Sequence, residues 1–556
     1  WRSAVVYQVY PRSFADSDGD GMGDLPGILS RLDYLADLGI DAVWISPFYS
    51  SPLNDGGYDV ADYRSIDARL GTMQDMDLLL QEAHARGIRV LMDIVPNHSS
   101  SEHRWFQDLL QSEPGSAAWD RYIVREGTGV DRENPPNNWR SVFHGSGWSP
   151  IRTPDGTPTG YWYLHLFDTT QPDLNWQNEE VRAEFRDILR FWFDRGVDGF
   201  RIDVAHGLVK EDGLPDYRYP ADDDATPPEM FDVEDVAHAP FWDQDGVHDI
   251  YREWRAVADE YAEPRIFCGE TWVPHPERLA RYQRPDELHT SFNFAYLEAG
   301  WDAARMKASV DETIAQHAKV GAPPTWVLSN HDVVRHRTRM APGFDNAARL
   351  TCAVDEERGL RRARAATLFT MALPGSMYLY QGEELGLPEV RDLDPDVRQD
   401  PAWLRSGGTD GMRDGCRVPI PWSGTEASFG FGPTAASWLP QPASWAALSV
   451  AAEDADPAST LAMYRAALRI RRETPAGTEG PLVWRASSDG LLAFERPAAD
   501  GRRVIVALNL AETTASLPTE WGTDLLVASS GDVAAMSIDG ADAGLVIGGE
   551  TCVWLS

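Results

Sequence analysis

The sequence predicts an α/β fold: a (β/α)8 TIM barrel with a small domain inserted after strand three and an antiparallel β-sandwich domain at the C-terminus. Short, almost continuously apolar runs alternate with segments of helical periodicity, as in a parallel sheet covered by helices. Eight such runs occur, which is the strand number of a closed barrel. After about residue 475 the pattern changes to short strands separated by turn residues. A doubly wound open sheet is the structural alternative.

The first strands and helices follow one another directly from the start of the chain. Each of the first two helical patterns ends in a glycine, a common helix stop. The expected strands are 5–11, 42–48 and 89–98, and the expected helices are 27–39 and 73–87.

The alternation breaks at about residue 99, where Pro, Gly, Trp, Asn and Ser become frequent. It resumes with a helix and the fourth strand, and a second long excursion precedes the last barrel helix; a run of that length is usually functional. The later elements are helix 179–196, strands 199–207, 265–271, 291–296, 325–331 and 376–384, excursion 385–460 and helix 461–474. We therefore expect a catalytic barrel over 1–98 and 177–474, an inserted domain over 99–176 and a C-terminal domain over 475–556.

The net charge of −37 over 556 residues argues against nucleic acid or an anionic membrane as a partner. No apolar run is long enough to span a membrane. The four cysteines are scattered, without metal-ligand spacing, and are expected to be reduced thiols. The chain begins at Trp1 without a signal-peptide pattern, so a cytoplasmic location is the default expectation.

Acidic residues stand at the ends of several expected barrel strands. Asp203 ends strand four, Glu270 ends strand five and Asp332 ends strand seven, while His98 ends strand three. Barrel enzymes place their chemistry at the carboxyl ends of the strands, so these side chains should converge on one mouth. A single such acid is usually a helix cap, but three together are not readily explained as caps.

Several carboxylates without any nucleotide, metalloprotease or serine-hydrolase motif indicate glycoside cleavage, with no cofactor for the chemistry. In that reaction one carboxylate attacks the anomeric carbon and another protonates the leaving oxygen. Arg201 is expected on the same strand face as Asp203 and should keep that acid ionised, as suits a nucleophile. Glu270, near other carboxylates, should hold its proton longer and act as the acid.

The chain resembles the α-amylase superfamily, glycoside hydrolase family 13. The segments DIVPNH, GFRIDVAH, GET and SNHD are similar to the four main regions of that family, in the same order. QPDLN at 171–175 resembles the fifth region of the α-glucosidase and oligo-1,6-glucosidase branch. The resemblance implies a retaining mechanism through a covalent glucosyl-enzyme, with Asp203 as nucleophile, Glu270 as acid/base and Asp332 as the third carboxylate.

The resemblance also implies the residues that bind a single glucose unit. Asp55 and Arg417 would pair and close the pocket beyond the non-reducing glucose, which means exo-action; an endo-amylase would need an open cleft. The family motif RTPMQW reads RVPIPW at 417–422, so the arginine is retained but its neighbours differ. The other implied substrate-binding residues are Tyr58, His98, Phe143, Phe167, Arg201 and His331.

The stretch DSDGDGMGD at 16–24 is a candidate metal loop. Hard cations prefer several oxygen ligands from a tight loop. Gly27 stands where an EF-hand has its bidentate glutamate, so an EF-hand is rejected. The resemblance implies a structural Ca²⁺ or Mg²⁺ held by Asp16, Asp18, Asp20, Asp24 and the Met22 carbonyl.

The leading hypothesis is an exo-acting α-glucosidase on short α-glucosides such as maltose or isomaltose. A transglucosylase or sucrose-active enzyme of the same family is the second. A non-catalytic binding or transporter-partner relative is the third, disfavoured because all three acids are present. Val204, after Asp203, resembles the α-1,6 type, but the following AHG is typical of neither linkage type.

Overall fold

The predicted barrel is confirmed. The structure is a computed structural model that describes residues 1–153, 155–219, 239–273, 275–411, 413–488, 490–538 and 541–556. Eight parallel strands form one sheet in the order β11-β10-β9-β5-β2-β1-β13-β12. Between the two edge strands, the Asn293 amide donates a hydrogen bond to the Thr325 carbonyl over 3.2 Å. The strands are β1 (Val5–Val9), β2 (Ala42–Ile45), β5 (Arg89–Ile94), β9 (Gly199–Ile202), β10 (Ile266–Gly269), β11 (Thr290–Ser291), β12 (Thr325–Val327) and β13 (Ser376–Tyr380).

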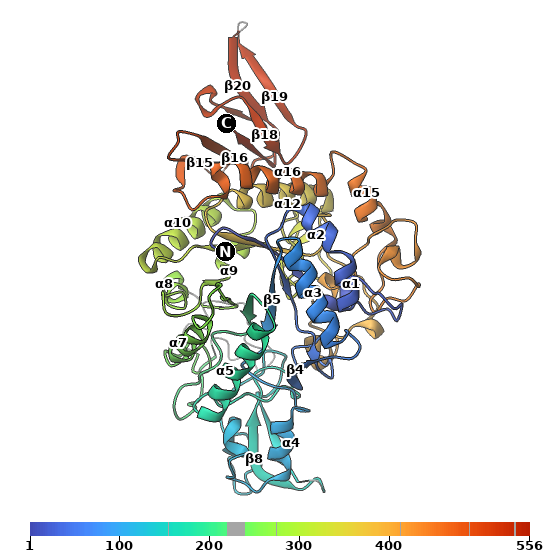
Figure 1. Cartoon of the computed structure of the whole chain (residues 1–556), viewed down its shortest axis with the longest axis vertical. Helices are drawn as coiled ribbons and strands as arrows, with labels where there is room; N and C mark the ends of the chain where they lie inside the picture. The colour runs from blue at the N-terminus through green and yellow to red at the C-terminus, as the bar shows by residue number, and fades with distance from the viewer. Residues whose placement is uncertain (154, 220–238, 274, 412, 489, 539–540) are drawn as a thin grey trace.

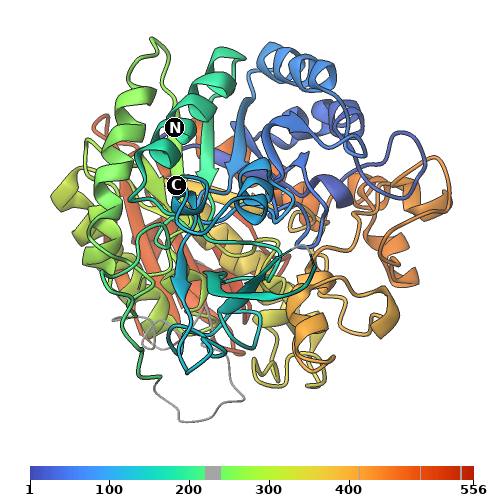
Figure 2. The ribbon, with the colours of Figure 1, turned by 90° about the horizontal axis from the view of Figure 1, so that it is seen from below.

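Helices surround these strands (Figures 1 and 2). Helix α3 begins with a capping box between Thr72 and Asp75, and buries Met76, Leu79 and Ala83 at helical spacing. The apolar faces of the surrounding helices cover the barrel sheet, which explains why the strands are apolar on both faces. The helices between barrel strands include α1 (Leu25–Ser30), α2 (Leu32–Leu38), α3 (Met73–Ala85), α5 (Glu179–Asp194), α7 (Val247–Ala258), α8 (Pro276–Arg281), α10 (Ala303–Val320), α11 (His336–Arg339) and α12 (Glu356–Met371).

The segment 291–296, predicted as one strand, is different in the structure. Only Thr290–Ser291 is strand, and a short helix α9 (Phe294–Leu297) follows. The Asn293 side chain caps this helix by accepting a hydrogen bond from the Tyr296 amide. A capping asparagine competes with strand geometry, and the aromatic run that suggested a strand packs instead as a helix turn.

Two excursions lie outside the barrel repeat. Between β5 and α5 the chain forms α4 (Arg104–Gln111) and an antiparallel sheet of β6 (Val124–Glu126), β7 (Trp148–Arg152) and β8 (Pro158–Leu164). In Figure 1, β8 and α4 lie at the opposite end of the molecule from the C-terminal sheets. The second excursion follows β13 and contains α13 (Pro401–Arg405), α14 (Arg413–Cys416) and α15 (Val450–Asp454), before the last barrel helix α16 (Thr460–Glu473). A separate two-stranded ribbon of β3 (Tyr49–Ser50) and β4 (Asp62–Ile66) follows β2.

The predicted antiparallel C-terminal domain is confirmed, and its strands form two sheets (Figure 1). One sheet has the order β14-β15-β16-β21-β18 and the other β17-β20-β19. Within the described residues, no helix is long and apolar enough to cross a membrane. The strands are β14 (Val483–Ser487), β15 (Leu491–Pro497), β16 (Arg503–Asn509), β17 (Ala515–Leu517), β18 (Leu525–Ala528), β19 (Val533–Ile538), β20 (Ala541–Ile547) and β21 (Thr551–Leu555).

Candidate active site

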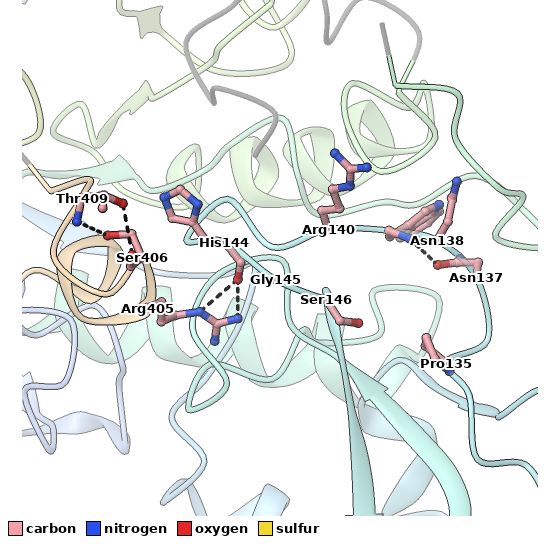
Figure 3. A pocket seen from close by; sticks show the side chains of 11 residues that line it. Pro135, Asn137, Asn138, Arg140, His144, Gly145, Ser146, Arg405, Ser406 and Thr409 are labelled. Carbon is pink, nitrogen blue, oxygen red and sulfur yellow. Dashed lines mark hydrogen bonds between the residues drawn. The ribbon is translucent and has the colours of Figure 1, made fainter. Parts of the chain in front are cut away.

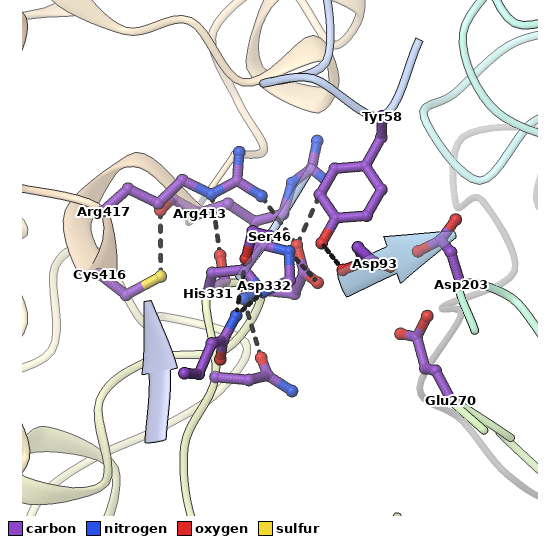
Figure 4. Close-up of polar contacts among 12 residues, drawn as sticks. Ser46, Tyr58, Asp93, Asp203, Glu270, His331, Asp332, Arg413, Cys416 and Arg417 are labelled. Atoms are coloured by element: carbon purple, nitrogen blue, oxygen red, sulfur yellow. Dashed lines mark hydrogen bonds and ion pairs between the residues drawn. The ribbon is translucent and has the colours of Figure 1, made fainter. Parts of the chain in front are cut away.

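The expected acids meet in one narrow cavity at the carboxyl ends of the barrel strands (Figure 4). Asp203 follows β9, Glu270 follows β10 and Asp332 follows β12, as the parallel topology requires. Arg201, His331 and Arg417, which were also predicted, contact these lining carboxylates. The cavity is lined by Asp55, Tyr58, His98, Phe143, Phe167, Asp203, Val204, Glu270, Asp332 and Arg413.

Arg201 is buried and holds two of the candidate catalytic acids together. Its Nη1 lies 2.8 Å from Asp203 Oδ1, and its Nη2 lies 2.7 Å from Glu270 Oε2. A third acid, Asp93 on β5, lies 2.9 Å from the same Nη1. Arg201 therefore lies beside Asp203 as expected, but it also contacts Asp93 through the same Nη1 and Glu270 through Nη2.

Burial changes the protonation of this cluster. It raises the pKa of Asp203 well above its ordinary value, although Arg201 opposes the shift. Burial also raises the pKa of Asp93 to about 6, against the same guanidinium. Three carboxyl groups around a single buried cation favour retaining a proton among them. The raised pKa of Asp203 runs against the expectation that Arg201 keeps this acid ionised.

Glu270 has its own hydrogen-bond donors. The Val204 amide donates to Glu270 Oε2 over 3.0 Å, and the Trp272 indole donates to Oε1 over 3.1 Å. Val204 has a φ of 44°, in the left-handed region that a β-branched residue rarely adopts. Such backbone strain costs about 1–3 kcal/mol and is typical of functional sites. Here it occurs directly after Asp203, at the residue whose amide orients Glu270.

Asp332 is surrounded by cationic groups (Figure 4). Arg417 Nη2 lies 2.8 Å and Arg413 Nη1 3.5 Å from Asp332 Oδ1. Burial alone would raise the pKa of Asp332, but His331, Arg417 and Arg413 together hold it far below its usual value. Asp332 is therefore an anion that can accept hydrogen bonds from hydroxyl groups.

The predicted pairing of Asp55 with Arg417 is wrong. Asp55 Oδ1 lies 2.9 Å from Nη2 of Arg413, while Arg417 contacts Asp332 and donates to the His331 carbonyl. Asp400 holds Arg413 in this place, since its Oδ1 lies 2.8 Å from the same Nη2. Arg413 and Arg417 stand four residues apart, one helical turn, so both point toward the cavity. The sequence RDGCR at 413–417 contains both arginines, but the family motif begins at the second, so Arg413 was not predicted as a site residue.

Aromatic rings form the walls of the cavity. The Tyr58 ring stacks on the His331 ring with centroids 5.2 Å apart, and its hydroxyl donates to Asp93 over 2.9 Å. Phe143 lies under the Arg413 guanidinium at 4.7 Å, and Phe167 lies 5.0 Å from the ring of His98. Burial lowers the pKa of His98 to about 4, so this imidazole is neutral at pH 7.

A model of the α-amylase catalytic domain matches residues 8–480. The chain belongs to the α-amylase family of glycoside hydrolases. A probable α-glucosidase of Rhizobium meliloti is 36% identical over 93% of this chain and 90% of its own length. An oligo-1,6-glucosidase of Heyndrickxia coagulans is 34% identical over 93% of each chain. A solved α-glucosyl transfer enzyme has a TM-score of 0.84 and 34% identity, covering 100% of this chain and 99% of that one. This α-amylase family member is therefore an enzyme of the α-glucosidase branch.

The predicted metal loop brings part of its acids together. Carboxylate oxygens of Asp16, Asp18 and Asp24 lie within 4.8 Å of one another. Asp20 is outside this group, and its Oδ1 accepts a hydrogen bond from the Met22 amide. Burial raises the pKa of Asp24, although its carboxylate accepts hydrogen bonds from the amide and hydroxyl of Ser17 and from the Gly27 amide. Three oxygen donors in a tight loop fit a hard divalent cation.

A larger cavity of about 560 Å³ lies between residues 135–146 and the end of α13 (Figure 3). Its polar groups are mostly engaged. Arg405 donates to the His144 carbonyl over 2.6 Å, and His144 Nε2 lies 3.0 Å from Asp410 Oδ2. Ser406 Oγ receives the Thr409 amide over 3.2 Å. The volume therefore offers few free partners for a ligand, and we assign the chemistry to the narrower cavity with the three acids.

Proposed function

We propose that this enzyme is a retaining, exo-acting α-glucosidase, in which Asp203 is the nucleophile, Glu270 the acid/base and Asp332 the stabilising carboxylate. One observation carries the proposal: Asp203 and Glu270 bind the two terminal nitrogens of the single Arg201 guanidinium. That arrangement supports the close carboxyl spacing of retaining enzymes, about 5 Å, over the wider spacing of inverting ones.

The proposed mechanism requires a proton on Glu270 and a free carboxylate on Asp203 when the α-glucoside binds. Glu270 protonates the glycosidic oxygen while Asp203 attacks the anomeric carbon, and the aglycone leaves with that proton. Glu270 then takes a proton from a water molecule. The oxygen of that water attacks the anomeric carbon, which cleaves the glucosyl ester and releases Asp203 as a carboxylate. Asp332, kept anionic by its arginines, accepts hydrogen bonds from sugar hydroxyls throughout.

The stereochemistry and the substrate range test the proposal together. Hydrolysis followed by proton NMR should show α-glucose as the first-formed product, and a fluorinated glucosyl substrate should trap an ester on Asp203. Comparing kcat/KM for maltose and isomaltose then assigns the linkage, for which Val204 and the oligo-1,6-glucosidase relative favour isomaltose. First-formed β-glucose, or no glucose from either disaccharide, would refute the proposal.

Exo-action rests on the ion pairs that close the cavity beyond the sugar. Arg413→Met leaves Asp55 and Asp400 buried without their shared cation, a loss of about 2–5 kcal/mol for a buried charge pair. We expect kcat/KM for disaccharides to fall about 100-fold, which corresponds to about 2.7 kcal/mol, in the lower part of that range. Arg349→Met is the control, because Arg349 pairs with Asp410 and neither residue lines the catalytic cavity. Unchanged disaccharide kinetics in Arg413→Met would contradict the role of this arginine.

A second candidate is transfer of the glucosyl unit to another sugar. The support is the 34% identity to a solved α-glucosyl transfer enzyme over nearly both full chains. The two outcomes differ only in whether water or a sugar hydroxyl attacks the glucosyl ester. Chromatography of products at high substrate concentration distinguishes them: longer sugars support transfer, and glucose alone supports hydrolysis.

We also propose that the loop of residues 16–24 binds Ca²⁺ or Mg²⁺ as a structural ion through Asp16, Asp18 and Asp24. Saturating metal should stabilise the protein by about 2–3 kcal/mol at 100 times its Kd. Chelation should therefore lower the Tm of the wild type by several degrees and that of Asp18→Asn much less. Asp20→Asn is the control, since Asp20 lies outside the cluster. Equal Tm values with metal and chelator in the wild type would contradict the site.

A further inference from the structure

Gln8 on β1 is a buried side chain that contacts a residue of the catalytic cavity. It is 1% exposed, and its Nε2 lies 2.7 Å from His331 Nδ1 and 3.2 Å from Ser46 Oγ. Its Oε1 has no hydrogen-bond partner among the described residues. Both amide hydrogens are thus used, one on Ser46 and one on the imidazole.

The surroundings of His331 decide which way this amide must face. The other ring nitrogen, Nε2, lies 3.2 Å from Oδ2 of Asp332, which is ionised. A lone pair on Nε2 would be repelled by that carboxylate, so Nε2 carries the hydrogen. Nδ1 is then an acceptor and needs a donor. The reversed amide would place the Gln8 oxygen against Nδ1 and force the proton to the wrong nitrogen.

The Nε2 hydrogen of His331 has a fixed direction but no acceptor among the described residues. Despite its proximity to Asp332, Nε2 is buried without a hydrogen-bond partner among the described residues. The ring is stacked on Tyr58 at 5.2 Å and on Tyr10 at 5.7 Å, so it cannot turn away. A buried unpaired donor beside the anionic Asp332 is suited to a hydroxyl group, which can accept from His331 and donate to Asp332.

We propose that Gln8 is a positioning residue that, together with Asp332, holds His331 in the tautomer with hydrogen on Nε2, so that this hydrogen is directed at a hydroxyl of the bound glucosyl unit. The substrate part of this inference rests on the proposed function; the tautomer does not. Gln8 is not among the residues that line the cavity and acts only through His331.

Gln8→Glu tests the proposal by reversing the chemistry at Nδ1. A carboxylate can only accept, so it draws a proton to Nδ1 and raises the pKa of His331. Below that raised pKa the ring is an imidazolium and keeps its Nε2 hydrogen; above it the neutral ring carries the proton on Nδ1 alone. We expect kcat/KM of this variant to fall about tenfold as the pH rises through the raised pKa of His331. The pH profile of the wild type should lack this descending limb. The other charged groups that face the ring are Asp332, Arg417, Arg201 and Arg413.

Gln8→Met removes the donor without adding charge. It should lower kcat/KM about tenfold at every pH without a new limb. Gln283→Glu is the matched control. The buried Gln283 also contacts a histidine, since its Nε2 lies 3.3 Å from Nε2 of His317 on α10, outside the catalytic cavity. Both glutamate variants place an acid against a buried histidine, so only a positioning role at the site separates their pH profiles.

A direct readout uses wild-type protein with ¹⁵N-labelled histidine, with His331→Gln to assign the signal. The ¹⁵N shifts should show a protonated Nε2 and an unprotonated Nδ1 at neutral pH, and in Gln8→Glu the proton should lie on Nδ1 at high pH. A wild-type ring protonated on Nδ1, or a Gln8→Glu profile parallel to that of Gln283→Glu, would overturn the proposal. If the enzyme cleaved no α-glucoside, these shifts would still decide the tautomer, while the proposed function would fail separately.

Discussion

Asp203→Asn is expected to lower kcat by about 10⁴- to 10⁶-fold, the range seen when a nucleophile is removed from an otherwise intact site. The amide has nearly the same shape but cannot form the glucosyl ester. It can still occupy the place beside Arg201, where Asp203 Oδ1 now lies 2.8 Å from Nη1. Steady-state kinetics on an aryl α-glucoside measure the loss, and a thermal melt shows that the fold is retained.

Asp93→Asn is the matched control for that variant. Asp93 shares the Arg201 guanidinium and receives the Tyr58 hydroxyl at 2.9 Å, yet it does not line the cavity. It should therefore reduce kcat at least 100-fold less than Asp203→Asn does, since it alters orientation and not bond formation. Comparable losses in the two variants would show that the acids act only through electrostatics. If Asp203→Asn kept more than about 1% of wild-type turnover, the assignment of Asp203 as nucleophile would be wrong.

The convergence of the three acids was predictable because parallel topology leaves little freedom. Once strands four, five and seven are placed in one barrel, residues at their carboxyl ends must share a mouth. Asp203, Glu270 and Asp332 follow from that argument alone, and the order of the family motifs assigns their expected roles. The glycines at 39 and 87 marked the ends of the first helical segments, but the segment predicted as one helix over 27–39 is two, α1 (Leu25–Ser30) and α2 (Leu32–Leu38).

Side-chain pairing was not predictable in the same way. Arg413 and Arg417 share a helical turn, and only the position of Asp400 decides which of them reaches Asp55. The division of Arg201 between Asp203 and Glu270 depends on where β10 lies beside β9. Protonation is further removed from the sequence, because the raised pKa of Asp203 reflects burial by segments distant along the chain.

Lys210 was also missed, and it has the largest expected effect on stability. Its Nζ lies 2.9 Å from Asp173 Oδ2 and 2.9 Å from Asn97 Oδ1, and it donates to the Gly207 carbonyl. The Asp173 side chain is fully buried and the Lys210 side chain nearly so, at 0% and 3% exposure. Burial lowers the pKa of Lys210 and Asp173 opposes the shift. The ammonium thus joins the inserted segment, which carries Asp173, to the ends of β5 and β9.

Lys210→Met should destabilise the protein by about 3–5 kcal/mol, because it leaves Asp173 buried as an uncompensated charge. Urea denaturation followed by tryptophan fluorescence measures the loss. Adding Asp173→Asn removes that charge and should restore part of the stability, since a neutral pair avoids the desolvation penalty. Lys307→Met, which breaks an exposed pair with Asp311, should cost less than about 1 kcal/mol. If the two single lysine variants unfolded at the same urea concentration, the buried ammonium would not be what ties these segments together.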